Sequence, residues 1–152
     1  MYRNKIIGIL TLVLCCVFLI GCGGGRAQVS GKVNFEDGSP LTNGEIWALS
    51  GDGIRVKGFV KADGSYALFE SMSGDGIPAG KQYKIWIANA IRSIPSTQMI
   101  QDETPGGGMI QAPPTMIAMI HDSFANPEST PLILDVPRGN STMTHDIVVR
   151  KP

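Results

Sequence analysis

The sequence contains few of the residues from which metal and catalytic sites are usually built. It has two histidines, His121 and His145, and its three cysteines all lie within the first 22 residues. Neither histidine belongs to an H-E-x-x-H pattern, and a zinc site needs three or four ligands within tetrahedral reach. The chain after residue 22 has no cysteine for a disulfide, so it must be stabilised by burial alone. We therefore predict no metal ligand and no cofactor.

An excess of charge of either sign is also lacking. The chain has 13 basic and 13 acidic residues, whereas a nucleic-acid-binding surface needs a basic stripe. A nucleophilic serine in a G-x-S-x-G turn is absent as well, and the nearest candidates, Ser73 and Ser123, are typical of loop serines. We predict that the protein binds no nucleic acid and is not an enzyme. Convergence of His121, Asp122 and a loop serine in the structure would favour a hydrolase instead.

Four Asp-Gly pairs are the remaining candidates for cation binding. They begin at Asp37, Asp52, Asp63 and Asp75, and none lies in the D-x-D-x-D-G register of a calcium loop. Asp-Gly is typical of tight turns, because glycine adopts the positive φ that such turns require. We interpret all four pairs as turns. If a metal site existed, the second, third and fourth aspartates would be its first candidate ligands.

The first 21 residues have the layout of a secretory signal. Arg3 and Lys5 precede an uncharged apolar stretch of about 15 residues, IIGILTLVLCCVFLI. A helix that spans a bilayer needs about 20 residues, so the stretch favours an export signal over a permanent single membrane span.

The end of this stretch, Leu19-Ile20-Gly21-Cys22, resembles the lipobox of bacterial lipoproteins. The resemblance implies that Leu19, Ile20 and Gly21 are recognised by the signal peptidase. Cys22 then becomes the first residue of the mature chain, lipidated on its sulfur, and two or more acyl chains of the palmitate kind anchor a protein stably to membrane lipid. Residues 22–28 include three consecutive glycines and are interpreted as a flexible tether. The alternative is an ordinary signal peptide that ends next to a cysteine.

The same resemblance implies a destination. The residue after Cys22 is Gly23 and not the aspartate that favours retention in the inner membrane. We therefore expect an exported protein that is anchored to a bacterial membrane, the outer membrane rather than the inner one.

Residues 29–150 have the pattern of an all-β domain. Short runs that alternate apolar and polar residues are separated by Gly, Asp, Asn or Pro. We expect no amphipathic helix and seven antiparallel strands, close to residues 29–35, 44–49, 54–61, 65–70, 83–87, 132–136 and 144–150. Seven short strands favour a Greek-key β-sandwich. The alternation stops after residue 88, and residues 89–128 form a long insertion.

Three stretches carry a family resemblance: VSGKVNFEDGSPLTNGEIWAL, GFVKADGSYAL and GDGIPAGKQYKIWI. They resemble the carboxypeptidase-regulatory-like or transthyretin-like (prealbumin-like) domains of bacterial lipoproteins, over residues 28–88 and 121–150. The resemblance implies a transthyretin-like sandwich. It is a resemblance to the domain appended to a zinc carboxypeptidase and not to the zinc enzyme itself. Its strand alternation puts Trp47 and Leu49 inside the domain and Trp86 outside.

Three other residues of these stretches have roles that follow from physical chemistry. Tyr83 is expected to point into the core, where a buried tyrosine hydroxyl needs a backbone partner. Gly31 and Gly58 indicate places where strands pack closely or bulge.

We expect a non-enzymatic, membrane-anchored envelope lipoprotein whose β-sandwich has a structural or binding role. The alternative is a carbohydrate- or protein-binding module. Trp86 is then the candidate ligand contact, although we expect the insertion to cover it. The second candidate ligand contact of such a module is residues 109–120, MIQAPPTMIAMI, which are unusually apolar for a loop. This segment either packs over a sheet or binds a partner. Core packing is the expected fate of this segment.

Overall fold

The computed structural model describes residues 25–70, 74–104 and 106–152. The predicted signal segment, the lipobox residues Leu19, Ile20 and Gly21, and the lipidated Cys22 lie outside the described residues, as does Ser73. Among the residues that are described, no helix is long and apolar enough to cross a membrane.

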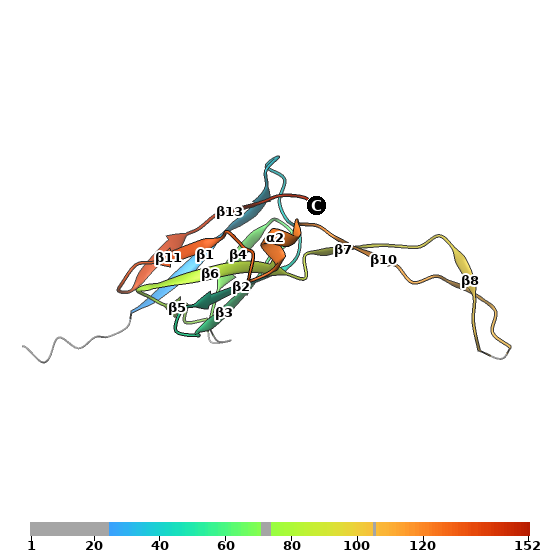
Figure 1. Ribbon diagram of the computed structural model, residues 1–152, viewed down its shortest axis with the longest axis horizontal. Coiled ribbons are helices and arrows are strands. Elements are labelled where there is room, and N and C mark those ends of the chain that lie inside the picture. Colours follow the sequence, from blue (N-terminus) through green and yellow to red (C-terminus); the bar gives the residue numbers. More distant parts are fainter. Residues whose placement is uncertain (1–24, 71–73, 105) are drawn as a thin grey trace, which may run out of the picture.

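The regular secondary structure of the described chain is almost all β-strand, which confirms the all-β prediction (Figure 1). One short helix, α2 (Asp122–Ala125), lies near the end of the insertion. The strands are β1 (Arg26–Phe35), β2 (Glu45–Ser50), β3 (Arg55–Phe59), β4 (Ser65–Leu68), β5 (Ile77–Pro78), β6 (Lys81–Ala88), β7 (Ile91–Ile94), β8 (Met99–Gln101), β9 (Met109–Gln111), β10 (Thr115–Ala118), β11 (Ile133–Val136), β12 (Ser141–Thr144) and β13 (Ile147–Val149).

Two main sheets share one core. In the first sheet β1 pairs with β4, β5, β12 and β13, and in the second the strand order is β11-β6-β2-β3. Alternate residues of β6, Tyr83, Ile85 and Ile87, are fully buried, and they belong to the same cluster as Val29 and Val33 of β1. Burying one large apolar side chain contributes about 1.5–3 kcal/mol, so this cluster is the main source of stability.

The last predicted strand, residues 144–150, contains β13, and β12 precedes it and overlaps it only at Thr144. Both β12 and β13 pair with β1 in parallel, so the prediction of a purely antiparallel domain is wrong at this edge. The ladder is interrupted between them, where the side chain of Asp146 accepts a hydrogen bond from the backbone N–H of Lys32 at 2.9 Å. At Lys32 the Asp146 carboxylate thus takes the place of a backbone partner. The first half of β1 pairs with β12, and the second half pairs with β13.

The prediction for Tyr83 is confirmed. Its side chain is fully buried, and its hydroxyl donates a hydrogen bond to the carbonyl oxygen of Pro78 at 2.8 Å. Burial raises the pKa of Tyr83 to about 12, so the hydroxyl stays protonated and remains a donor at physiological pH.

The prediction for Trp47 and Leu49 is wrong. Their neighbours Ile46 and Ala48 are buried, whereas Trp47 and Leu49 lie half-buried on the outer face of the second sheet. A shift of one residue in the assumed alternation exchanges the two faces of a strand. Trp86 lies on the outer face as predicted, directly opposite Trp47.

The insertion forms a long two-stranded arm, which we define as residues 91–118. β7 pairs with β10 and β8 pairs with β9, both antiparallel, whereas Pro95, Pro113 and Pro114 lie between the two paired segments. Figure 1 shows that the arm projects beyond the two main sheets, at the end opposite to the start of β1. The expectation that residues 109–120 pack against the domain is therefore wrong for residues 109–118, whereas Met119 and Ile120 do pack there.

The base of the arm is fixed to the sheets by buried residues and hydrogen bonds. Ala90 and Ile120, which flank the arm, belong to the core, and the carbonyl oxygen of Ala90 accepts a hydrogen bond from the N–H of Met119 at 2.8 Å. The Asn43 side chain donates to the carbonyl oxygen of Ile91 at 2.7 Å. The chain turns into the arm at Asn89, whose φ of 55° is a conformation that asparagine tolerates better than most residues.

Gly31 and Gly58 are confirmed as points of close approach. A Cβ atom on Gly31 would overlap the carbonyl oxygen of His145, and one on Gly58 would overlap that of Ala67. These oxygens belong to the backbone and have little freedom to move away.

We predict that Gly31→Ala lowers the free energy of unfolding by about 3 kcal/mol, because the added methyl group forces neighbouring strands apart. Gly51→Ala is the matched control, since nothing lies within 4 Å of a Cβ atom there. Chemical denaturation of both variants measures the difference. Equal stabilities would contradict the proposed close packing at Gly31.

Candidate functional site

The residues proposed for hydrolase chemistry do meet, but as a helix cap. His121 Nδ1 lies 2.9 Å from Ser123 Oγ and accepts a hydrogen bond from the N–H of Ser123 at 3.2 Å. This is the N-cap arrangement of α2, with Asp122 in the first turn. In the described chain, no carboxylate is hydrogen bonded to the His121 ring, so the group that would orient a catalytic base is missing from the site. The capping role accounts for the contact.

Of the aspartates singled out as cation ligands, Asp52 and Asp63 lie in turns as predicted, whereas Asp75 lies outside a turn. Within residues 25–70, 74–104 and 106–152, no three acidic or histidine side chains converge on a common point. Asp63 accepts hydrogen bonds from Ser65 N–H at 3.0 Å and Ser65 Oγ at 2.7 Å, and these lower its pKa. Asp52 pairs with Lys81 and also accepts from Ser50 Oγ, and the Lys81 hydrogen bond is the main cause of its lowered pKa. The Asp75 carbonyl oxygen accepts from the Arg26 side chain.

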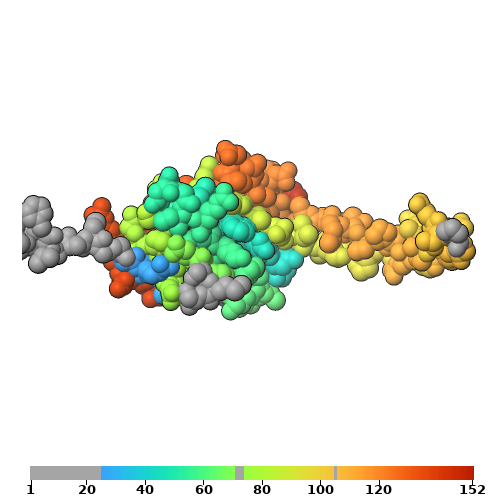
Figure 2. All heavy atoms as spheres, turned by 90° about the horizontal axis from the view of Figure 1, so that it is seen from below, coloured from blue at the N-terminus to red at the C-terminus, as the bar shows by residue number. Residues whose placement is uncertain are grey.

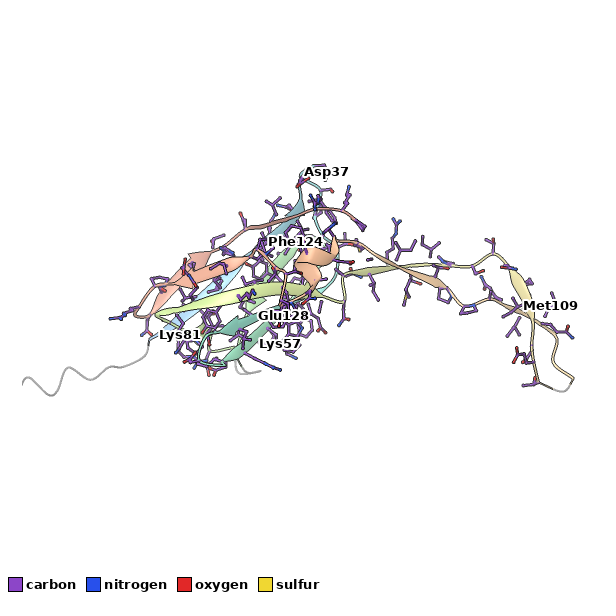
Figure 3. The ribbon with its side chains drawn as sticks, in the orientation of Figure 1. Asp37, Lys57, Lys81, Met109, Phe124 and Glu128 are labelled. Carbon is purple, nitrogen blue, oxygen red and sulfur yellow. The ribbon has the colours of Figure 1, made fainter. Side chains whose placement is uncertain are left out.

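Trp86 is part of a pair of tryptophans. The rings of Trp47 and Trp86 are nearly parallel, with centroids 6.3 Å apart and planes inclined by 13°. Trp47 Nε1 donates to Glu45 Oε2 at 3.1 Å, and Lys57 Nζ lies 5.8 Å from the centre of the Trp47 ring. Figure 3 shows Lys57 on the second sheet, away from the arm. The two candidate binding elements, Trp86 and residues 109–120, are therefore on different parts of the molecule.

The arm carries most of the exposed apolar surface of the described chain. Eight of its eleven exposed large apolar side chains lie there: Ile91, Ile94, Met99, Ile100, Met109, Ile110, Met116 and Ile117. Met109, near the tip, is 62% exposed, and Met116 is 60% exposed. Figure 2 shows the arm as a narrow projection that no other part of the described chain covers on the visible face, and Figure 3 places Met109 at its far end. A monomeric protein rarely leaves so much contiguous apolar surface uncovered.

Both faces of the arm are apolar, and both of its edges are open. Residues that are directly opposite in an antiparallel pair share a face. Ile100 and Ile110 form one such pair, whereas Met99 and Met109 point to the other face because side chains alternate along a strand. Since the ribbon has only two strands, each strand has one side without a hydrogen-bonded neighbour. The arm can thus be recognised through side chains and through backbone groups.

A groove lies where the arm leaves the sheets. Its volume is about 390 Å³, and its lining includes Phe35, Ile117 and Met119 together with the cations Arg92 and Lys151. Lys151 is paired with Asp37 at 2.6 Å. Arg92 is exposed, and no carboxylate of the described residues pairs with it. The groove therefore combines an apolar floor with one uncompensated positive charge.

Sequence reasoning identified the apolar segment but missed its form and its base groove. The signal for a hairpin was present, because two Met-Ile-Gln triplets at residues 99–101 and 109–111 flank a glycine-rich turn. The groove had no sequence signal, since Phe35, Arg92 and Lys151 are far apart in the chain. No protein-family model, curated protein or solved structure matches this chain.

We predict that the arm can be removed without unfolding the domain. Ile91 and Ala118 are directly opposite each other, so an Asn-Gly turn that replaces residues 92–117 closes the hairpin at its base. Because the arm adds no residue to the core, the melting temperature should change by less than about 5 °C. Thermal unfolding followed by circular dichroism tests this, and a loss of cooperative unfolding would show that the arm supports the core.

Proposed function

We propose that this protein is a non-enzymatic, lipid-anchored envelope lipoprotein, and that its arm binds another protein. The observation that carries the proposal is the arm itself, a ribbon that exposes apolar side chains on both faces and is fixed to a stable domain at one end. We further propose that the two main sheets are a Greek-key, transthyretin-like sandwich. The positions of β1, β2, β4 and β6, which lie largely within the stretches that resemble that family, support this assignment.

The position of the arm suits a membrane-anchored protein. β1 begins at Arg26, four residues after Cys22, and the arm projects from the opposite end of the domain (Figure 1). A lipid on Cys22 would hold the start of β1 close to the membrane through a short glycine tether. The arm would then project from the end of the domain that is farthest from the lipid, where it can reach a partner. The outer membrane remains the proposed location.

The chemistry of the arm favours a protein over other ligands. Residues 91–118 contain no aromatic residue, which disfavours stacking on sugar rings, and no lysine. Interfacial membrane binding typically uses Trp, Phe and many basic residues, whereas the arm has a single arginine. Isoleucine and methionine side chains next to open strand edges suit a protein partner, because methionine adapts to varied surfaces and a strand edge accepts an added strand.

Carbohydrate binding has less support. The tryptophan pair would be its platform, but both rings are half-buried and stacked near each other, and Lys57 lies over the Trp47 ring. The area left for a sugar ring is therefore small.

Lipidation is tested by metabolic labelling with a palmitate analogue. We expect the natural chain to be labelled and to fractionate with membranes, and Cys22→Ala to lose both properties, because alanine has no thiol to which a lipid can be attached. Arg55→Glu, an exposed substitution in β3, is the control for general effects on expression. Equal labelling of the natural chain and Cys22→Ala would contradict the anchor.

Protein binding by the arm is tested by photo-cross-linking in intact cells. Replacing Met109 with benzoylphenylalanine should give a light-dependent adduct, because this side chain is exposed at the tip of the arm. Phe59 is the matched control position, since it is exposed to a similar degree but lies on β3, outside the arm. Adducts from neither position, or from both equally, would contradict a binding role of the arm.

A further inference from the structure

The distribution of charged side chains along the arm indicates what kind of partner it binds. Along residues 91–118 there are three charged side chains, Arg92 near the base and Asp102 and Glu103 near the tip. Asp102 accepts a hydrogen bond from the N–H of Thr104 at 3.1 Å, and no cation of the described residues pairs with either carboxylate. One end of the arm thus has an uncompensated positive charge and the other end has two uncompensated negative charges.

Taking the binding role of the arm as its premise, we propose that the arm's partner is a second copy of this chain, with the two arms lying antiparallel. The acidic tip of each arm then reaches the base groove of the other, where Arg92 is located. A two-fold axis between the arms makes the two contacts identical, which is the arrangement of most homodimers. Parallel arms would instead bring the two acidic tips together, and like charges in contact are unfavourable.

Pairing of the opposite charges sets the alignment of the two arms. Arg92 and Asp102 are ten residues apart, or roughly 33 Å at about 3.3 Å per residue in an extended chain. In an antiparallel pair centred near Thr97, Arg92 of each copy lies beside Asp102 of the other. The same alignment brings Ile94 beside Ile100, and both side chains are exposed in the single chain.

The apolar surfaces of the two ends also suit each other. The base groove is lined by Phe35, Ile117 and Met119, and the tip carries Met99 and Met109, which are 50% and 62% exposed. Methionine side chains are flexible enough to fill an irregular groove. Burial of these side chains would supply most of the affinity, while the charges set the direction in which the arms align.

The test uses two variants of the full-length chain, purified from membranes in detergent and examined by sedimentation velocity. The first is Arg92→Glu and the second combines Asp102→Lys with Glu103→Lys. In either variant alone, like charges meet at both contacts, so self-association should weaken at least about tenfold. In an equimolar mixture, both contacts of a mixed pair have opposite charges again, and dimers should return to within about threefold of the natural chain. Arg55→Glu is the matched control, an exposed arginine that lies outside the arm.

The two-fold arrangement is overturned if the natural chain is monomeric, if the separate variants associate as well as the natural chain, or if their mixture does not recover. Photo-cross-linking from Met109 separates this failure from failure of the binding role. An adduct with twice the mass of the chain supports the second copy. An adduct of the chain labelled at position 109 with a different protein alone overturns the second copy but leaves the binding role, and the absence of any adduct overturns both.

Discussion

The burial of Ala90 and Ile120 in the shared core is the contact on which the arrangement of the molecule depends. These residues flank the arm, and the core that surrounds them contains side chains from both main sheets. Because the two ends of the arm are held in a close-packed interior, the arm leaves the domain in a fixed direction. The domain can therefore act as a rigid mount for a segment that is itself exposed along its whole length.

The arm is a structure that a partner would stabilise. An isolated two-stranded ribbon is marginally stable in water, because it has neither a third strand nor a covered face. Exposed edges and apolar side chains are usually protected in natural proteins, for example by lysines, prolines or bulges. Here prolines interrupt the strands, but no lysine is present in residues 91–118. The arm thus exposes apolar side chains and unpaired strand edges to water, which is energetically unfavourable. The gain from covering them is the physical basis of the proposed binding role.

Several features of the fold could be read from local sequence. The alternation around Tyr83 predicted a strand with a buried tyrosine, and the glycines at 31 and 58 predicted close strand approach; the structure agrees with each. The face of β2 could not be read in the same way, because both of its alternating sets contain apolar residues. Trp47 and Ala48 are each acceptable in a core, and only the pairing of β2 with β6 puts the two tryptophans on one outer face. The parallel pairing of β12 and β13 had no local signal either, since strand direction depends on the connection between strands.

The sequence alone determined the all-β class, the positions of most strands in the two main sheets, and an insertion that is rich in methionine and isoleucine. These properties depend on residues that are close in the chain, where alternation and turn residues act directly. The tertiary structure decided that the insertion is a projecting arm and that its base forms a groove with Phe35 and Lys151. The groove in particular depends on contacts between segments that are far apart in the chain, and composition does not encode which distant segments meet.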